Sequence, residues 1–242
     1  MAVLTGAGIS TDSGIPDYRG PQGLWQRDPD AQELVTIGPY LASSEVRRRS
    51  WLMRRDAGAI GAEPNAGHRA LADLERAGVP MRVLTQNVDG LHQAAGLPAR
   101  KVVELHGTAT EVQCVRCRVT GPMAAVLERV AAGEDDPACE QCGGVLRPRT
   151  VMFGEALDER VLQQADAIAK NCQVFLAVGS SLQVHPAALL PGIALEHDAR
   201  LIVVNGEPTP WDRAAHEVVR EPISQALPEL VARLVDGDLS EV

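Results

Sequence analysis

Five short apolar runs recur along the chain, and each is followed at once by small or polar residues. The runs cover residues 2–5, 81–85, 102–105, 174–178 and 201–204. Such runs, separated by segments with helical periodicity, are typical of a parallel sheet with helices on both faces. The carboxyl ends of parallel strands meet at one edge, where ligands bind. The pattern therefore predicts an α/β, Rossmann-like fold with a single ligand site at that edge.

The segments between these runs include three clear helix candidates. Residues 66–77 place His68, Leu71 and Leu74 at helical spacing and stop at Gly78, a suitable C-terminal cap. Residues 157–170 and 223–235 are also amphipathic. In the last of these, Pro228 predicts a break or a first turn, because proline removes a backbone donor.

Two stretches lack this rhythm of strand and helix. Residues 31–65 have helical character without an apolar strand, and residues 109–148 hold all the paired cysteines. We expect both to be insertions that together form a smaller lobe. The predicted domains are a Rossmann-like domain over residues 1–30, 66–108 and 149–242, a helical insertion over 31–65 and a zinc-binding insertion over 109–148.

Composition limits the classes of function. The net charge of -9 disfavours direct nucleic-acid binding, which normally needs a basic face, and it tolerates basic partners such as lysine-bearing proteins. No run is long enough to cross a membrane, and the N-terminus does not resemble a secretion signal. We therefore expect a soluble, cytoplasmic protein with no membrane partner.

The cysteine spacing predicts a metal site. Cys114-x-x-Cys117 and Cys139-x-x-Cys142 form two pairs, and Gly143-Gly144 after the second pair permits a tight turn. Two such pairs can close a tetrahedral Zn2+ site, and four sulfurs leave no open position for catalysis. We expect one structural zinc ion, with redox-active or unbound thiols as the alternative. Cys172 has no partner and is expected to be a buried hydrophobe.

The residues that follow the apolar runs suggest the ligand. Gly6-Ala7-Gly8 would let the backbone approach a pyrophosphate, although Thr11 replaces the third glycine of the usual dinucleotide fingerprint. An ordinary glycine turn is the alternative. Gly179-Ser180-Ser181 suits a phosphate or ribose, and an ordinary helix cap explains it equally well.

A series of motifs closely resembles the sirtuin family and runs in order over nearly the whole chain. The motifs are Gly6-Ala7-Gly8-Ile9-Ser10-Thr11 with Gly14-Ile15-Pro16-Asp17-Tyr18-Arg19-Gly20, Thr85-Gln86-Asn87-Val88-Asp89-Gly90-Leu91-His92, Glu104-Leu105-His106-Gly107, Phe153-Gly154-Glu155 and Gly179-Ser180-Ser181-Leu182. The resemblance implies an NAD-dependent protein-lysine deacylase. In sirtuins the acyl oxygen attacks C1′ of the nicotinamide ribose, nicotinamide leaves, and an alkylimidate forms. The products are free lysine and O-acyl-ADP-ribose.

The resemblance also implies roles for individual residues. His106 matches the general base, and imidazole suits this role because its unperturbed pKa lies near neutral pH. Asn87 and Asp89 match the nicotinamide amide pocket. The full set matched to NAD contains Gly6, Ala7, Gly8, Ser10, Thr11, Asp17, Tyr18, Arg19, Gln86, Asn87, Asp89, Gly179, Ser180, Ser181, Asn205 and Glu207. In that set Asp17, Tyr18 and Arg19 match a mobile loop over the cofactor, and Asn205 and Glu207 match the adenosine end. His92 is expected to be structural, and His68 to lie in the core or on a helix surface.

The substrate residues follow from the same resemblance. Val151, Phe153 and Gly154 match the strand that lines the acyl-lysine tunnel, and Val184 matches the opposite wall. In sirtuins the acyl-lysine protein or peptide lies between these segments as an added strand, so backbone contacts dominate its binding. A plain core strand is the alternative for Val151.

Three departures from the family pattern narrow these expectations. The chain begins almost at the first strand, whereas sirtuins usually carry a preceding helix, so the helix is absent or the recorded start is late. Arg147-Pro148-Arg149-Thr150 places a positive charge near the tunnel strand. Trp51-x-x-Arg54 lacks the tyrosine of the Tyr-x-x-Arg pair of desuccinylating sirtuins, which makes efficient desuccinylation doubtful. Residues 15–25 with the divergent insertion after them look closest to the class II branch, related to a mitochondrial sirtuin with weak deacetylase activity.

Rival functions are a protein mono-ADP-ribosyltransferase using the same NAD site, a nicotinamide dehydrogenase, and a zinc module that binds nucleic acid. The retained Asn87, Asp89 and His106 favour the deacylase over the transferase. The zinc cysteines and the missing third glycine disfavour the dehydrogenase. The net charge and the cofactor crevice disfavour the nucleic-acid module.

Overall fold

The computed structural model describes residues 1–17, 29–56 and 61–236. A six-stranded sheet forms its centre, with the order β3-β2-β1-β7-β8-β9, and all of its pairs are parallel. The strands are β1 (Ala2–Thr5), β2 (Arg82–Thr85), β3 (Val102–Glu104), β7 (Val174–Val178), β8 (Arg200–Val204) and β9 (Glu217–Val219). Each predicted apolar run forms one of these strands. The edge strand β9 was not predicted, because it is short and none of its residues is buried.

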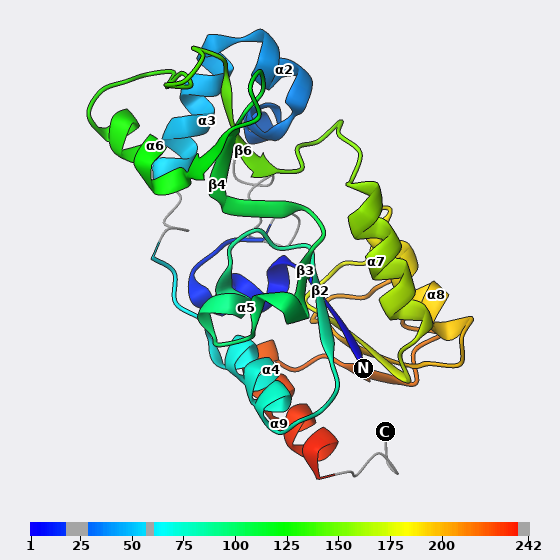
Figure 1. Ribbon diagram of the computed structural model, residues 1–242. Coiled ribbons are helices and arrows are strands. Elements are labelled where there is room, and N and C mark those ends of the chain that lie inside the picture. Colours follow the sequence, from blue (N-terminus) through cyan, green and yellow to red (C-terminus); the bar gives the residue numbers. More distant parts are fainter. Residues whose placement is uncertain (18–28, 57–60, 237–242) are drawn as a thin grey trace.

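Helices cover both faces of this sheet, as the periodicity predicted (Figure 1). On one face α4 (Ala66–Arg76) and α9 (Ile223–Val235) pack with Val3, Val83 and Ile202 in one hydrophobic cluster. On the other, α7 (Glu159–Lys170) and α8 (Leu190–Leu195) pack with Leu4, Phe175 and Val203. The switch of face between Val3 and Leu4 reflects the two-residue period of a strand. The predicted Rossmann-like α/β fold is confirmed.

Pro228 neither breaks α9 nor begins it. The helix α9 (Ile223–Val235) continues through Pro228. Leu227 and Leu230, on either side of the proline, are buried against the sheet. Since most helix stability in proteins comes from packing of the apolar face, this burial outweighs the loss of one backbone hydrogen bond.

The two stretches without the strand–helix rhythm share a second core, which Figure 1 shows at one end of the molecule. We call the elements of this core the small lobe. They are η2 (Pro29–Val35), α2 (Ile37–Ala42), α3 (Ser44–Asp56), α6 (Met123–Ala131), and a three-stranded antiparallel sheet of β4 (Gly107–Cys114), β5 (Thr120–Pro122) and β6 (Leu146–Thr150). Tyr40 and Trp51 from the first stretch pack with Val112 and Leu146 from the second. The predicted domain boundaries themselves stay a prediction.

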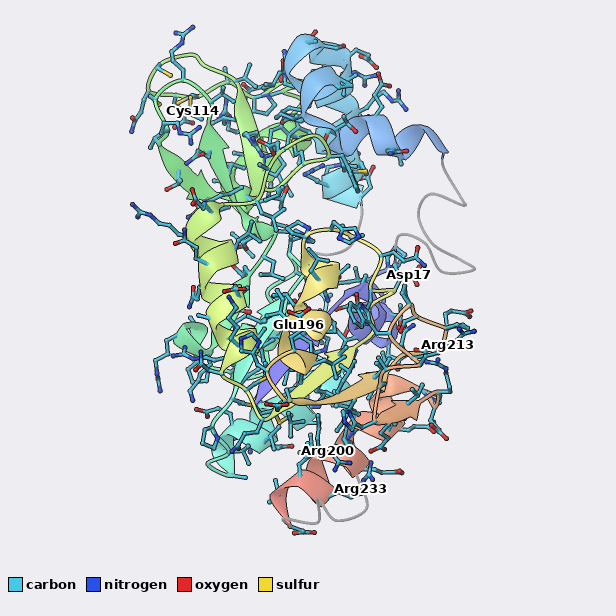
Figure 2. The ribbon with its side chains drawn as sticks, turned by 90° about the vertical axis from the view of Figure 1, so that its right-hand side faces the viewer. Asp17, Cys114, Glu196, Arg200, Arg213 and Arg233 are labelled. Carbon is cyan, nitrogen blue, oxygen red and sulfur yellow. The ribbon has the colours of Figure 1, made fainter. Side chains whose placement is uncertain are left out.

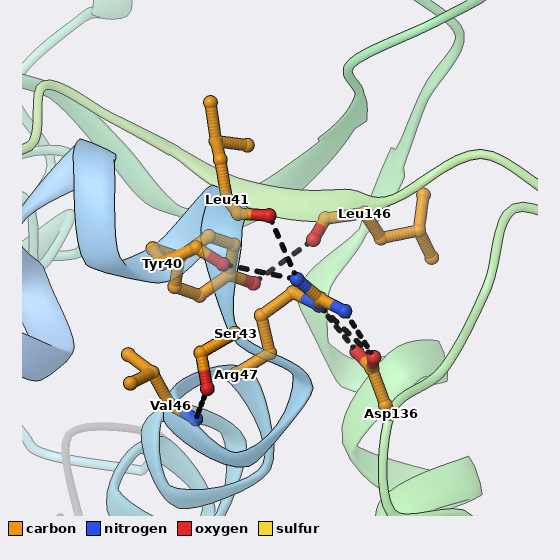
Figure 3. A network of polar contacts seen from close by, with 7 residues as sticks. All are labelled: Tyr40, Leu41, Ser43, Val46, Arg47, Asp136 and Leu146. Carbon is orange, nitrogen blue, oxygen red and sulfur yellow. Dashed lines mark hydrogen bonds and ion pairs between the residues drawn. The ribbon is translucent and has the colours of Figure 1, made fainter.

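A single arginine ties the two parts of the small lobe together (Figure 3). Arg47 of α3 donates from Nε and Nη2 to the carboxylate of Asp136, at 2.8–3.0 Å, and its side chain is only 11% exposed. Its Nη1 donates to the carbonyl oxygens of Tyr40 and Leu41 at 3.1 Å, near the C-terminal end of α2. Helix-end carbonyl groups lack intrahelical partners, so Arg47 satisfies them while it holds the acidic loop after α6.

No helix among the described residues is long and apolar enough to span a membrane.

The substitution Arg47→Met should lower the free energy of unfolding by about 1–3 kcal/mol, because Asp136 and two carbonyl groups lose a shielded donor. Arg48→Met is the matched control, since the Arg48–Glu45 pair on the same helix is exposed. The control should change the free energy by less than about 0.5 kcal/mol. Urea unfolding followed by circular dichroism measures both values, and equal losses in the two variants would contradict the assignment.

Candidate active site

The carboxyl ends of five strands lie level with one another. Thr5 is the Cα partner of both Thr85 and Val178, Thr85 is the partner of Glu104, and Val178 is the partner of Val204. The residues that follow these strands therefore emerge at a single edge of the sheet. β1 lies between β2 and β7, where the strand order changes direction, and in open α/β sheets this switch point is where ligands bind.

Glycines let the loops after β1 and β7 touch each other. Gly8 N donates to Gly179 O at 2.8 Å. A Cβ on Gly6 or Gly8 would lie within 2.9 Å of Gly179 or Ser180. Gly179 has a φ of +61°, and a Cβ there would lie 2.4 Å from Ile9 N. The glycines predicted to admit a pyrophosphate are thus also required for contact between the two loops. Thr11, at the position of the missing third glycine, donates its hydroxyl to Gly8 O.

The hydroxyl of Ser10 organises the polar residues at this edge. It donates to Asp89 Oδ2 at 2.7 Å and accepts from Asn87 Nδ2 at 3.1 Å. Asn87 Nδ2 also lies 3.1 Å from Gly6 O, and Asp89 Oδ1 accepts from Leu91 N at 2.9 Å. The structure therefore brings together Ser10, Asn87 and Asp89, which the sequence motifs assigned to one pocket.

Two buried histidines, His68 and His92, contact Ser10 and Thr5. The sequence motifs did not assign His68 to the site. His68 accepts from Asn65 N through Nδ1, so its Nε2–H faces Ser10 Oγ at 3.4 Å. His92 contacts the hydroxyl of Thr5 at 2.8 Å. Burial lowers the pKa of His68 to about 4 and that of His92 to about 3, so both are neutral at pH 7. The signal that could have identified His68 is its position three residues after the helix-capping Asn65, which forms a reciprocal capping box with it.

His106 follows β3 and presents one free ring nitrogen. Its Nδ1 lies 2.9 Å from Gln86 O, and since a carbonyl oxygen only accepts, Nδ1 carries the proton and Nε2 is unprotonated. Burial lowers the pKa of His106 below its ordinary value, and the bond to Gln86 only partly offsets this. A half-buried neutral imidazole with an unprotonated Nε2 can act as a base.

Gln86 links the loops after β2 and β7. Its Oε1 accepts from Ser180 Oγ at 3.0 Å, and Ser180 Oγ also accepts from Leu182 N. Ser180 thus caps a turn and not a regular helix. The Nε2 of Gln86 is buried and has no hydrogen-bond partner among the described residues. A buried amide donor without an acceptor at a ligand edge fits the oxygen-rich ribose and phosphate groups of NAD.

The remaining residues matched to NAD lie further along the same edge. Ala7 lies in η1 (Ala7–Ser13) and Ser181 follows Ser180. Asn205 follows β8 and donates from Nδ2 to Glu207 O at 2.7 Å, while Glu207 is exposed. Asp17 is half-buried. The predicted loop residues Tyr18 and Arg19 lie outside the described residues.

The predicted substrate segment is attached to His106. Val151 N donates to His106 O at 2.8 Å. Phe153 N donates to Val35 O, and Phe153 O accepts from Ile37 N, so the segment bridges to the small lobe. The regular strand β6 ends at Thr150, and Phe153 forms only an isolated bridge with Thr36, which differs from the continuous strand predicted there. Phe153 is 37% exposed. Val184, on the predicted opposite wall, is half-buried in a turn whose Ala188 N bonds to Val184 O.

The two residues compared with the Tyr-x-x-Arg pair, Trp51 and Arg54, lie on α3 of the small lobe. Trp51 is fully buried. Arg54 Nη1 donates to Ser50 Oγ at 2.8 Å. The expectation of inefficient desuccinylation, which rests on the missing tyrosine, stays a prediction.

The four paired cysteines converge as the spacing predicted. Their ligand atoms all lie within 4.8 Å of one another, with Cys114 and Cys142 Sγ 3.5 Å apart and Cys117 and Cys139 Sγ 3.7 Å apart. These separations exclude disulfide bonds, and they match the S···S distance of about 3.8 Å implied by four Zn–S bonds in a tetrahedron. The four thiols are positioned to hold one zinc ion. Cys172 is buried and bonds to Ala169 O, as expected of a structural cysteine.

The metal site is separate from the ligand edge. Figure 2 shows Cys114 within the upper part of the molecule and Asp17 well below it, near the strand ends. A tetrahedral site closed by four cysteines and located in the small lobe has a structural role there and does not supply a catalytic water.

The fold and the site define a nucleotide-binding, Rossmann-like protein with an attached four-cysteine metal centre. The Sir2 family matches residues 6–186 of the chain. An NAD-dependent protein deacetylase of Streptomyces coelicolor is 67% identical over 234 residues, covering 97% of each chain. Among solved structures, one from work on the mechanism and regulation of Sir2 enzymes has a TM-score of 0.86 at 41% identity, covering 98% of this chain and 92% of that chain. A Sir2 complex with a p53 peptide and NAD+ has a TM-score of 0.81 at 34% identity, covering 98% and 92%.

The chain therefore belongs to the Sir2 family. The resemblance to sirtuins drawn from the motifs is confirmed, whereas the assignment to the class II branch stays a prediction.

The substitution Gly179→Ala should lower the free energy of unfolding by more than about 2 kcal/mol, because it adds a steric clash to an unfavourable backbone angle. Gly14→Ala is the matched control, since Gly14 also has a positive φ, of +83°, but nothing within 4 Å of the added Cβ. The control should cost only about 1–2 kcal/mol from the backbone angle. If urea unfolding gave the same loss for both, contact between the two loops would not be the reason for the glycine.

Proposed function

We propose that this chain removes acyl groups from protein lysines with NAD as co-substrate, producing nicotinamide, O-acyl-ADP-ribose and the free lysine. The observation that carries the proposal is that His106, Ser10, Asn87 and Asp89 all follow strands that end at one edge of the sheet, in a chain of the Sir2 family. The relatives named as NAD-dependent protein deacetylases support the same activity. No feature of the described site favours the ADP-ribosyltransferase alternative.

NAD supplies an electrophilic ribose carbon and nicotinamide as a leaving group. The loops after β1, β2 and β7 would hold its phosphates and ribose, through Gly6, Ala7, Gly8, Ser10, Thr11, Gln86, Gly179, Ser180 and Ser181. Asn87 and Asp89 would pair with the nicotinamide amide, since an amide and a carboxylate offer complementary donors and acceptors. Asn205 and Glu207 would hold the adenosine end, and Asp17, Tyr18 and Arg19 would cover the cofactor.

His106 would take a proton from a ribose hydroxyl. Its bond to Gln86 O fixes the tautomer that leaves Nε2 free, and burial keeps the ring neutral at working pH. The neutral state of His68 matters for a different reason. An uncharged ring leaves the hydrogen bond to Asp89 as the interaction that orients the Ser10 hydroxyl.

The acyl-lysine segment of a substrate protein would lie between residues 151–154 and Val184. Val151, Phe153 and Gly154 line one side, and the backbone attachment of Val151 to His106 sets the distance from the substrate to the base. Recognition through backbone contacts would accept many sequences around the lysine. We also propose the cytoplasm as the location, because a reducing compartment preserves the four thiols for zinc.

The substitution His106→Ala should abolish formation of O-acetyl-ADP-ribose from NAD and an acetyl-lysine peptide, with a loss of about 100-fold or more in kcat/KM. His197→Ala is the matched control, because His197 is exposed and its Nδ1 also bonds to a backbone carbonyl group. Mass spectrometry of the products and nicotinamide release measure the outcome. ADP-ribose accumulating on protein, without deacylation of acetyl-lysine or longer and acidic acyl-lysine peptides, would replace the proposal with the transferase.

The pH profile of kcat/KM should report the neutral form of His106. A base is active when deprotonated, so activity should fall as the pH drops through the pKa of His106 in the folded protein. Burial lowers this pKa below 6.5, so the midpoint of the acid limb should lie below that pH. Zinc content measured at each pH controls for metal loss. An acid limb centred above 6.5 would contradict the assignment of His106.

A further inference from the structure

Arg147 and Glu155 form a bidentate ion pair. Arg147 precedes the predicted substrate segment, residues 151–154, and Glu155 directly follows it. Arg147, on β6, donates from Nη1 to Glu155 Oε1 and from Nη2 to Glu155 Oε2, both at 2.5 Å. Their side chains are 16% and 24% exposed. Paired, planar contacts of this kind are stronger and more directional than a single hydrogen bond.

The same two side chains also hold the backbone between them. Arg147 Nη2 donates to Thr150 O at 2.7 Å, and its Nε donates to Pro148 O at 3.2 Å. Glu155 Oε2 accepts from Met152 N at 2.8 Å, and Glu155 N returns a bond to Met152 O. Each member of the pair therefore hydrogen-bonds to the backbone of residues 148–152 as well as to its partner.

The segment needs these contacts because the strand ladder does not reach it. β6 ends at Thr150, and Pro148 has no N–H to contribute to the ladder. Beyond Thr150, Val151 is attached to His106 and Phe153 to the small lobe by main-chain bonds. Met152 lies between these two attachments, and both of its backbone polar groups bond to Glu155.

Glu155 is charged under working conditions. Burial raises the pKa of its carboxyl, but the hydrogen bonds from Arg147 and Met152 N and the charge of Arg147 outweigh burial and leave the pKa below its usual value. The pair is therefore a charge-assisted contact, and removal of either partner leaves a poorly hydrated charge and unpaired backbone groups.

We infer that Arg147 and Glu155 are positioning residues that set the acyl-lysine-binding segment relative to His106. They control affinity for the acyl-lysine peptide and not for NAD. The inference rests on the proposed function, which assigns peptide binding to residues 151–154. The residues matched to NAD lie on the loops after β1, β2, β7 and β8, whereas the pair bonds to the backbone of Pro148, Thr150 and Met152.

The test compares Glu155→Gln and Arg147→Met with the wild type in nicotinamide release driven by an acetyl-lysine peptide. The KM for the peptide should rise about tenfold in each, while the KM for NAD stays within about twofold. Glu111→Gln is the matched control. This substitution removes the ion pair between Arg149 on β6 and Glu111 on β4. The pair is exposed, with side chains 53% and 41% exposed. This control should leave the peptide KM within about twofold.

The double variant Arg147→Met/Glu155→Gln distinguishes positioning through the pair from independent effects. Two residues that act as one unit should cost no more together than either alone. Thermal unfolding and zinc content check that each variant is folded, and Glu155→Asp, which keeps the carboxylate, should recover part of the peptide affinity if Glu155→Gln is unstable.

An unchanged peptide KM, or equal rises in the KM values for peptide and NAD, would overturn the inference while leaving the proposed function intact. The proposed function fails separately if the wild type shows no peptide-dependent release with any acyl group, and the inference then falls with it.

Discussion

The contact between the loops after β1 and β7 is the constraint on which the rest of the site depends. The parallel register brings the ends of these strands to one level, and Gly6, Gly8 and Gly179 let their loops meet backbone to backbone. That contact places Ser10 on one side and Ser180 on the other. Any side chain at Gly179 would push the loops apart, and the groups that converge on a dinucleotide would then separate.

From this contact, hydrogen bonds extend to the loop after β2 and to α4. Ser10 connects the loop after β1 with Asn87 and Asp89 after β2, and His68 supports Ser10 from α4. Because burial keeps His68 and His92 neutral, the network carries few charges beneath the site. The hydrogen bonds of Ser10 to Asn87, Asp89 and His68 restrict the movement of these side chains, which suits a pocket that must hold a flexible ligand in one geometry.

The small lobe is connected to the same site by main-chain bonds. His106 O accepts from Val151 N, and Phe153 exchanges bonds with Val35 and Ile37. The helical part of the lobe is in turn joined to its cysteine-bearing part by Arg47 and Asp136. The four-cysteine centre is therefore connected to the predicted substrate segment only through packing and hydrogen bonds of the small lobe.

The sequence was sufficient to predict five of the six strands of the sheet, the helices α4, α7 and α9, the convergence of the four paired cysteines and that of the polar residues at one edge, but not α8. Apolar runs and Cys-x-x-Cys spacing are local signals. An apolar run predicts a buried strand, and paired cysteines predict a metal site, without knowledge of distant contacts. β9 was missed because a short edge strand carries no apolar run. Contacts between residues distant in the chain, such as Arg47 with Asp136 or His68 with Ser10, produce no periodic pattern in the sequence. They could not be predicted from it. The role of Gly179 in loop contact also depends on tertiary packing, so only the structure shows it.

The most direct test of the central claim is a crystal structure of the protein with NAD and an acetyl-lysine peptide. The account predicts that an oxygen atom of NAD accepts from Gln86 Nε2, which has no partner among the described residues. It also predicts that His106 Nε2 faces a ribose hydroxyl. NAD bound away from the loops after β1 and β7, or Gln86 Nε2 still without an acceptor in the complex, would contradict it.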